Sequence, residues 1–328
     1  MCDASRARFR HCCEFRRMKI HVRSSRYRWY ADIPSALFVL AVTTNTILIC
    51  RAPSLWLLVP LTCLQALLMV GCQEAKHLSV HGTFFHNRRV NDAVGIACAA
   101  LFGVNFVSYR YFHFAHHRAT CTEADPEGRL YSLSWRTRWI WLLAPIELPW
   151  VAWHIGRTAW PMVPAAKRLQ RHVACLGMAT FGLSLVAGLL VAPLAIACAY
   201  LIPLTLFSWF DFLLTQAEHY GVAVAAPLST STTSHDRNTQ TLSHDIVLPL
   251  GLGWLTLHRS LHAVHHANPA LRWFEAPRAL KRGRTAEPIS YAGFARRWFA
   301  SGPRLWLTAQ GERANATIPG SFHSARRS

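Results

Sequence analysis

Charged residues are scarce in this chain. Only 16% of its 328 residues are Asp, Glu, Lys or Arg, whereas 52% are hydrophobic. Acidic residues are scarcer than basic ones: the chain has 16 Asp and Glu and 35 Lys and Arg, which gives a net charge of +19. The length would permit one or two soluble domains. Long apolar runs with so little charge instead predict a protein that crosses a membrane several times.

Several signals of other protein classes are also missing. The ten cysteines show no metal-binding or disulfide spacing, and several lie in apolar runs, where cysteine behaves as a small hydrophobic residue. Residues 1–30 contain no apolar core before a cleavage site, so we expect no cleavable signal peptide. The basic residues flank the apolar runs instead of forming one soluble face. This is typical of loops next to anionic lipid, and we expect no nucleic-acid partner.

Four apolar runs are long enough to cross a bilayer, which takes about 17–25 residues. They are Pro34–Cys50, Ser54–Gly71, Cys175–Val191 and Leu194–Leu214. Very short breaks separate the members of each pair, so the sequence predicts two tight helical hairpins. The segment 221–243 is rich in Ser and Thr and is predicted to be a loop.

Basic residues gather on one side of the predicted hairpins. They crowd the N-terminal arm, the region 87–89 and the region 167–171, whereas the turn at Pro193 has none. The positive-inside rule then places both termini and the central segment in the cytoplasm. We expect a basic cytoplasmic arm (1–30), a membrane domain (31–300) and a disordered basic tail (301–328).

A fifth apolar run, Ala93–Ser108, is short for a span. It lies between two histidine clusters, which would face opposite sides of the membrane if the run crossed it once. We therefore predict a re-entrant or interfacial segment, with a fifth span as the alternative. The Trp-rich stretch Trp135–Trp160 is predicted to be a helix lying at the membrane interface.

Nine of the 18 histidines follow a recurrent pattern. A HxxxH cluster comes after the second span, and HxxHH clusters follow the fifth apolar run and the fourth span. A further histidine stands at the end of the fourth span. The nine residues are His77 and His81, then His113, His116 and His117, then His219, and finally His262, His265 and His266.

The spacing has a geometric meaning. Positions i, i+3 and i+4 share one face of a helix, so each cluster can direct two or three imidazoles at one point. A single HxxxH could arise by chance, but three clusters at one predicted membrane face predict a metal centre. Nine nitrogen ligands are too many for one metal and suit two. Imidazole binds Zn, Cu, Fe and Ni, so the spacing does not identify the metal.

These clusters resemble the three histidine boxes of the membrane fatty acid desaturase superfamily. The flanking sequences are similar too. The family's first box and the residues after it are resembled by Glu74-Ala75-Lys76-His77 and the following residues to Asp92. The family's segment with the isolated histidine is resembled by Gln216-Ala217-Glu218-His219-Tyr220-Gly221. The resemblance covers about residues 30–280. It implies an all-α integral membrane fold with a cytoplasmic helical cap that holds two iron ions. It also implies O₂ as co-substrate and all nine histidines as ligands, with their division between the irons left open.

The sequence departs from the family in two places. After the third box, Pro269 and Trp273 persist but the remainder of the usual motif has drifted, which puts acyl specificity in doubt. Thr215 stands where some relatives have an Asn that orders a metal-bound water, a role for which Gln216 is a candidate.

Other polar residues near the boxes have two interpretations each. His86 and His258 lie outside the box spacing and are more consistent with supporting or surface roles than with ligation. Asp211, Glu218 and Asp245 could accept hydrogen bonds from ligand imidazoles, as carboxylates around metal sites do. A purely structural role is an equal alternative for each carboxylate.

The predicted activity is O₂-dependent desaturation of a fatty acyl or other lipid-like substrate. The partners would be that substrate and a small redox protein of the ferredoxin or cytochrome b5 kind, docking on the basic face. The alternatives are a hydroxylase or ketolase of the same superfamily, or a non-catalytic membrane protein that binds or transports metal. Transporters place such residues at mid-membrane between repeats, whereas these histidines gather at one face and no repeat is visible.

Overall fold

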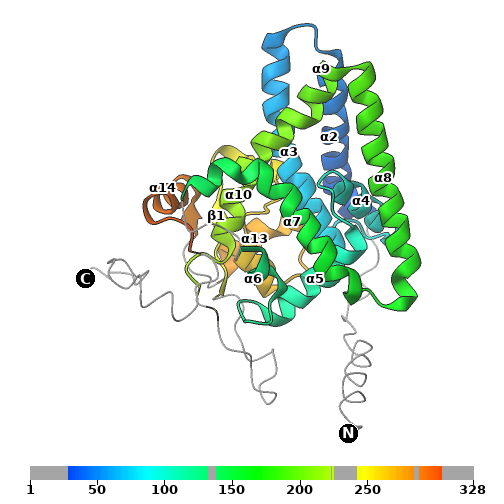
Figure 1. The fold of residues 1–328 in the computed structure, drawn as a ribbon. Coiled ribbons are helices and arrows are strands. Elements are labelled where there is room, and N and C mark those ends of the chain that lie inside the picture. The colour runs from blue at the N-terminus through cyan, green and yellow to red at the C-terminus, as the bar shows by residue number, and fades with distance from the viewer. Residues whose placement is uncertain (1–28, 132–137, 223, 225–241, 284–287, 305–328) are drawn as a thin grey trace.

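The computed structural model describes residues 29–131, 138–222, 224, 242–283 and 288–304, and the fold within them is almost entirely helical. Four long helices stand side by side, and shorter helices gather around one end of them (Figure 1). Four helical segments are long and apolar enough to cross a membrane: Tyr30–Arg51, Leu55–His81, Ala165–Val191 and Pro193–Glu218. The predicted all-α membrane fold with four spans in two hairpins is confirmed. The predictions for 1–28 and 305–328 lie outside the described residues.

The first hairpin consists of α2 (Ile33–Arg51) and α3 (Leu55–His81). Polar groups join the two helices inside their apolar surroundings: the Asn45 side chain donates to Gln65 Oε1 at 2.7 Å and to the Leu61 carbonyl at 3.0 Å. Small clusters of interhelical hydrogen bonds of this kind stabilise helix pairs in lipid. Helix α3 continues unbroken past the end of the predicted apolar run at Gly71, as far as His81.

The second hairpin consists of α8 (Arg168–Val191) and a segment from Pro193 to Glu218. That segment begins as α9 (Pro193–Ile196), passes through a π-helical turn (Ala197–Leu201) and continues as α10 (Ile202–Glu218). Helix α8 ends with the predicted run at Val191 but begins before its predicted start at Cys175, and α10 continues past the predicted end at Leu214. Both extensions are at the end where the helices leave the apolar layer and retain polar residues. The turns of both hairpins lie together, at the top of Figure 1.

The short apolar run at 93–108 is divided between two helices. Helix α4 (Arg88–Ala100) ends within it, and α5 (Phe106–Ala119) begins after a turn, with the Asn105 side chain accepting from Ser108 N at 3.0 Å as its N-cap. Neither is among the segments that could span a membrane. At Gly95, any Cβ would overlap Phe106 and Ser79, so a glycine is required where α4 crosses α5 and α3.

The remaining helices surround the lower end of the hairpins. They are α6 (Pro126–Tyr131), α7 (Ala144–Ala159), α11 (Leu252–Leu255), α12 (His262–Ala267), α13 (Ala276–Arg282) and α14 (Tyr291–Ser301), with 3-10 turns at Trp29–Asp32, Arg138–Leu143, Trp160–Met162, Ala165–Lys167, Pro249–Gly251 and Trp273–Glu275. Two-residue strands β1 (Ile246–Val247) and β2 (Ile289–Ser290) pair in parallel. The predicted Trp-rich helix Trp135–Trp160 is a 3-10 turn followed by α7, and residues 135–137 of it lie outside the described part.

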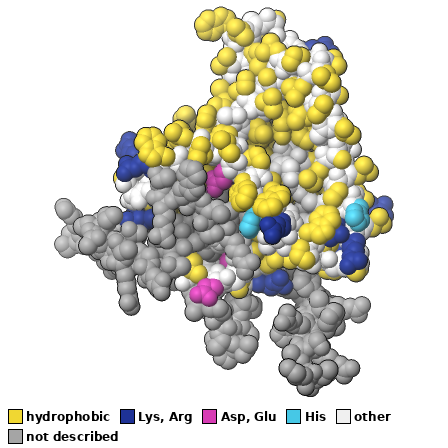
Figure 2. Space-filling model, viewed as in Figure 1, with side chains coloured by type: hydrophobic (Ala, Val, Ile, Leu, Met, Phe, Trp, Pro, Cys, Tyr) yellow, Lys and Arg dark blue, Asp and Glu magenta, His cyan; other side chains and the backbone are white. Residues whose placement is uncertain are grey.

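Apolar side chains cover the visible face of the long helices (Figure 2). On α8, Leu169, Leu176, Leu183 and Leu190 are all more than 65% exposed. Leucine exposed along a whole helix is costly in water, so these helices require an apolar solvent.

The segment after the third histidine cluster is anchored at the start of α2. Trp273 Nε1 donates to Ser35 Oγ at 3.1 Å, and the Arg272 guanidinium donates to Asp32 at 2.6 Å and to the Phe84 carbonyl at 3.0 Å. Ser35 Oγ in turn donates to the Phe84 carbonyl at 2.7 Å. This network joins the first helix, the loop after the first cluster and the chain after the third cluster.

Replacing Trp273, which is 6% exposed, with Ala should destabilise the protein by about 3–5 kcal/mol, the usual cost of removing a large buried aromatic side chain. Unfolding in detergent micelles would measure the effect. Trp139, 68% exposed, is the matched control, and its Ala variant should change stability by about 0.5 kcal/mol or less. Equal effects of the two substitutions would contradict the anchoring role.

Candidate metal centre

The first cluster lies on the last two turns of α3. His77 and His81 are four residues apart and project from the same face, and their Nε2 atoms lie 3.0 and 2.9 Å from His113 Nε2. Glu74, one turn earlier, has Oε2 3.0 Å from His77 Nδ1. Because α3 is one continuous helix, its apolar part and its ligand face are rigidly connected.

The second cluster lies on α5 and is split between two directions. The i, i+4 pair His113 and His117 points the same way, with 2.8 Å between the Nε2 atoms. His116 points toward the third cluster instead, with Nε2 3.4 Å from His266 Nε2. Its Nδ1 lies 2.9 Å from Asp125 Oδ2 and 3.5 Å from Glu127 Oε2.

The third cluster is arranged in the same manner on α12. His262 and His266 form the i, i+4 pair, with Nε2 atoms 3.0 Å apart, and His265 points back to His117 at 3.1 Å. His219 follows the last residue of α10 and lies 3.3 Å from His262. Asp245 accepts from the backbone N–H groups of Ala263 and Val264 at 2.9 and 3.2 Å, which fixes the start of this short helix.

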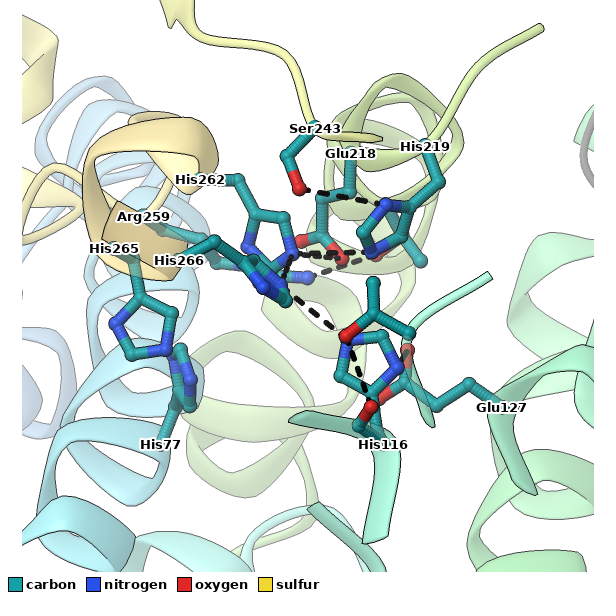
Figure 3. A network of polar contacts seen from close by, with 12 residues as sticks. His77, His116, Glu127, Glu218, His219, Ser243, Arg259, His262, His265 and His266 are labelled. Atoms are coloured by element: carbon teal, nitrogen blue, oxygen red, sulfur yellow. Dashed lines mark hydrogen bonds and ion pairs between the residues drawn. The ribbon is translucent and has the colours of Figure 1, made fainter. Parts of the chain in front are cut away.

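The nine predicted histidines therefore form two groups in space. The first group is His77, His81, His113, His117 and His265, and the second is His116, His219, His262 and His266. The ligand atoms within each group lie within 4.8 Å of one another, little more than twice a typical metal–nitrogen bond of about 2.1 Å. Figure 3 shows His77 and His265 on one side, apart from the four histidines of the second group.

Hydrogen bonds at the outer ring nitrogens orient several of these imidazoles. The Leu242 carbonyl can only accept, so His219 Nδ1, 2.6 Å away, must carry the proton. Nε2 of that ring is then left with a lone pair directed into the group. Glu74 and Asp125 act in the same way on His77 and His116. This is the arrangement that presents neutral imidazoles to a metal.

Burial keeps most of these imidazoles neutral. It lowers the pKa of His262, His265 and His266 well below the usual value, and neighbouring histidines add to the effect. Burial lowers the pKa of His219 to about 3. At His116 burial is outweighed by Glu127 and Asp125, which raise the pKa to about 9. A cation at its Nε2 would displace that proton, since ligation requires the neutral ring.

A buried arginine joins α10 to the chain just before the third cluster. Arg259 Nε donates to Asp211 Oδ1 at 2.6 Å, Nη2 donates to Thr215 Oγ1 at 2.8 Å, and Nη1 lies 2.8 Å from Glu218 Oε1. The carboxylates of Asp211 and Glu218 hold the pKa of Arg259 above its usual value despite burial. The turn leading to Arg259 has φ of 52° at Leu257 and 56° at His258, a region that residues other than glycine rarely adopt.

A cavity of about 130 Å³ reaches the histidines from the side of the long helices. Its walls come mainly from α3, α5, α7 and α10, and His77, His113 and His262 are among the residues that line it. Leu148, Val151 and Ile155 of α7 form much of its apolar wall, so α7 covers the cavity.

The other predicted residues take different places. Neither His86 nor His258 joins a histidine group within the described residues. Asp211 bonds to Arg259 and Asp245 caps α12, so these two carboxylates have the structural roles. Glu218 pairs with Arg259, and its Oε2 lies 3.9 Å from His262 Nε2. Thr215 accepts from Arg259, and Gln216 Oε1 accepts from Trp298 Nε1 at 3.2 Å.

Sequence reasoning missed Glu74, Asp125, Glu127 and Arg259. Glu74 could have been found, because it precedes His77 by three residues on a helix and must share its face. Asp125 and Glu127 come after the end of α5, and the chain turns back to bring them to His116. Helical periodicity does not predict such a turn.

The pattern of helices and histidine groups has a counterpart among known families. A sequence model of the fatty acid desaturase family matches residues 54–298, which is most of the chain. The chain belongs to the fatty acid desaturase family. Members of this family are oxidoreductases of the desaturase or hydroxylase type. No curated protein sequence matches the chain. The match includes all nine histidines, α7 and the cavity.

The residues fit the metal dependence typical of the desaturase family. Two buried groups of imidazole nitrogens, with no thiolate among them, could each hold a metal ion. Histidine-rich sets of this kind accept Fe, Zn, Cu or Ni. The first group offers five nitrogens and the second four.

Replacing Asp125 with Asn should weaken metal binding in the second group, because the amide no longer orients and polarises the His116 ring. Loss of such an outer partner typically costs about 10–100-fold in affinity. Metal retained after dialysis against a chelator would measure this. The control is Glu123→Gln, an exposed acid two residues away, which should retain metal as the unaltered protein does. Equal retention by both variants would contradict the role of Asp125.

Proposed function

We propose that the protein is an O₂-dependent di-iron desaturase that introduces a double bond into a fatty acyl or other lipid-like substrate. The observation that carries the proposal is the pair of histidine groups beside a buried cavity at the end of four membrane-type helices. Family membership supports oxidation of a lipid-like substrate, and an all-nitrogen site suits a redox-active metal such as iron.

His77, His81, His113, His117 and His265 would hold one iron, and His116, His219, His262 and His266 the other. When bound, the two irons would supply the oxidising power that O₂ provides. The balance is one substrate, one O₂, two electrons and two protons, giving one double bond and two waters. A small external redox protein, such as a ferredoxin or a cytochrome b5-like protein, would supply the electrons from the cytoplasmic side.

The chain's own residues position the reaction and exclude water. Leu148, Val151 and Ile155 on α7 close the cavity over the histidines. Glu74, Asp125 and the Leu242 carbonyl hold the Nδ1 protons, so the rings keep a fixed direction. Arg259 fixes the spacing between α10 and α12 by binding Asp211 and Glu218. Such fixed geometry selects which carbon reaches the centre.

Two single substitutions test the metal assignment separately for each group. Protein purified from iron-supplied cells should contain about two irons per chain, one for each histidine group. His81→Ala should lower iron in the first group and His219→Ala in the second, leaving about one in each variant. His86→Ala, outside both groups, is the control. One iron or none in folded wild-type protein, or no loss in the variants, would refute the di-iron assignment.

Product analysis tests the reaction. Iron-loaded protein in vesicles, with O₂ and a chemical or protein reductant, should convert a lipid to a product two hydrogens lighter, seen by mass spectrometry. A product heavier by one oxygen would instead identify the hydroxylase alternative. Full metal content without any product across acyl lipids, sphingoid bases and smaller apolar metabolites would favour a metal-binding role without catalysis.

A further inference from the structure

A buried lysine stands in the wall of the cavity. Lys76 is 2% exposed and lies on α3, directly before the ligand His77 and about one turn before the end of the helix. Its Nζ donates to Gln73 Oε1 at 2.8 Å and lies 4.1 Å from the centre of the Tyr109 ring. A lysine buried this completely is costly unless it is paired, so its place in the cavity wall calls for an explanation.

Within the described residues, Lys76 has no carboxylate within ion-pair distance, although the cavity wall is rich in acids. Asp211 and Glu218 are bound by Arg259, and Glu127 faces His116. An ammonium group has three donors, of which Gln73 takes one and the Tyr109 ring face another. Among the described residues, the third donor has only the Phe102 ring face near it, 5.8 Å away, and Lys76 lines the cavity. A saturated alkyl chain there would bury that donor without a hydrogen bond, at a cost of about 1–3 kcal/mol.

A second cavity, of about 260 Å³, lies further along the same two helices and is apolar. Its walls are Cys63, Ala66 and Leu67 of α3 and Leu206, Phe207 and Phe210 of α10. Phe207 also lines the first cavity, so the two spaces adjoin at this side chain. Along α3 the order from the hairpin turn is apolar cavity, then Gln73 and Lys76, then the histidines.

We propose that Lys76, held by Gln73, binds a hydroxyl or carbonyl oxygen of the substrate beside the histidine groups. The substrate's hydrocarbon chain extends past Phe207 into the apolar cavity between α3 and α10. Glu147 also lines this cavity and has no cationic partner in the described part of the chain. It would repel a substrate carboxylate, so the site favours an uncharged hydroxyl or carbonyl group. This inference rests on the proposed function for its substrate class.

The placement also restricts the position of oxidation. Tyr109 connects the two sites, since Lys76 Nζ lies over its ring at 4.1 Å and the ring stacks on that of His113 with centres 5.7 Å apart. A polar group held at Lys76 is therefore close to the first histidine group. The carbon that reacts lies near the oxygen-bearing end of the substrate, and not in the middle of its chain.

Hexadecan-1-ol and hexadecane, at equal mole fraction in phosphatidylcholine vesicles, are the probes. The alcohol should raise the thermal unfolding midpoint of the metal-loaded protein more than the alkane, and should be oxidised near its hydroxyl end with a preference of about tenfold or more. Lys76→Met keeps the length of the side chain but not its donors, and should remove this preference. Lys167→Met, outside the cavity walls, is the matched control and should retain it.

Metal content, measured in every variant, separates loss of the centre from loss of recognition. If Lys76→Met does not fold, Gln73→Leu serves instead. The preference for hexadecan-1-ol over hexadecane can in any case be measured on the unaltered protein. Equal stabilisation and turnover of the two probes, or oxidation in mid-chain, would overturn the role of Lys76 while leaving the oxidase function intact. Selective stabilisation by the alcohol that Lys76→Met removes, with no product from either probe, would support the site and count against the proposed function.

Discussion

The site depends on one geometric constraint, the difference between i+3 and i+4 on a helix. In both HxxHH clusters the i, i+4 pair serves one histidine group and the i+3 residue serves the other. On α5, His113 and His117 point to the first group and His116 to the second; on α12, His262 and His266 point to the second and His265 to the first. Each helix therefore contributes to both groups. The first group forms only where α3, α5 and α12 meet, and the second only where α5 and α12 meet the end of α10.

Bringing nine imidazoles together requires that most of them stay neutral. Burial and mutual repulsion lower the pKa of His113 and of all three histidines of α12. Carboxylates and carbonyls lie on the outside of the groups, where they accept Nδ1 protons and leave Nε2 free. One guanidinium, that of Arg259, pairs with both Asp211 and Glu218 close by. The electrostatic arrangement therefore favours a bound cation at the centre of each group.

Long-range contacts hold the parts of the centre in register. Arg272 and Trp273 follow the third cluster but bond to Asp32 and Ser35 at the start of the first long helix, and to the loop after the first cluster. The persistence of Trp273 near a drifted motif is explained by this structural role. The walls of the cavity are part apolar and part polar. The long helices supply the apolar residues, and the segments that carry the histidines supply the polar ones.

The sequence by itself determined the spans and the ligand candidates, since both are local. Apolar length sets a span, and helical spacing sets a shared face, so four helices and nine histidines could be identified without coordinates. The helix ends on the side of the histidines could not, because α3 carries polar residues as far as His81, whereas its apolar run stops at Gly71. Only the tertiary structure decided how the histidines divide into two groups. Asp125, Arg259 and Lys76 likewise acquire their partners from distant segments, and no local periodicity encodes which segments will meet.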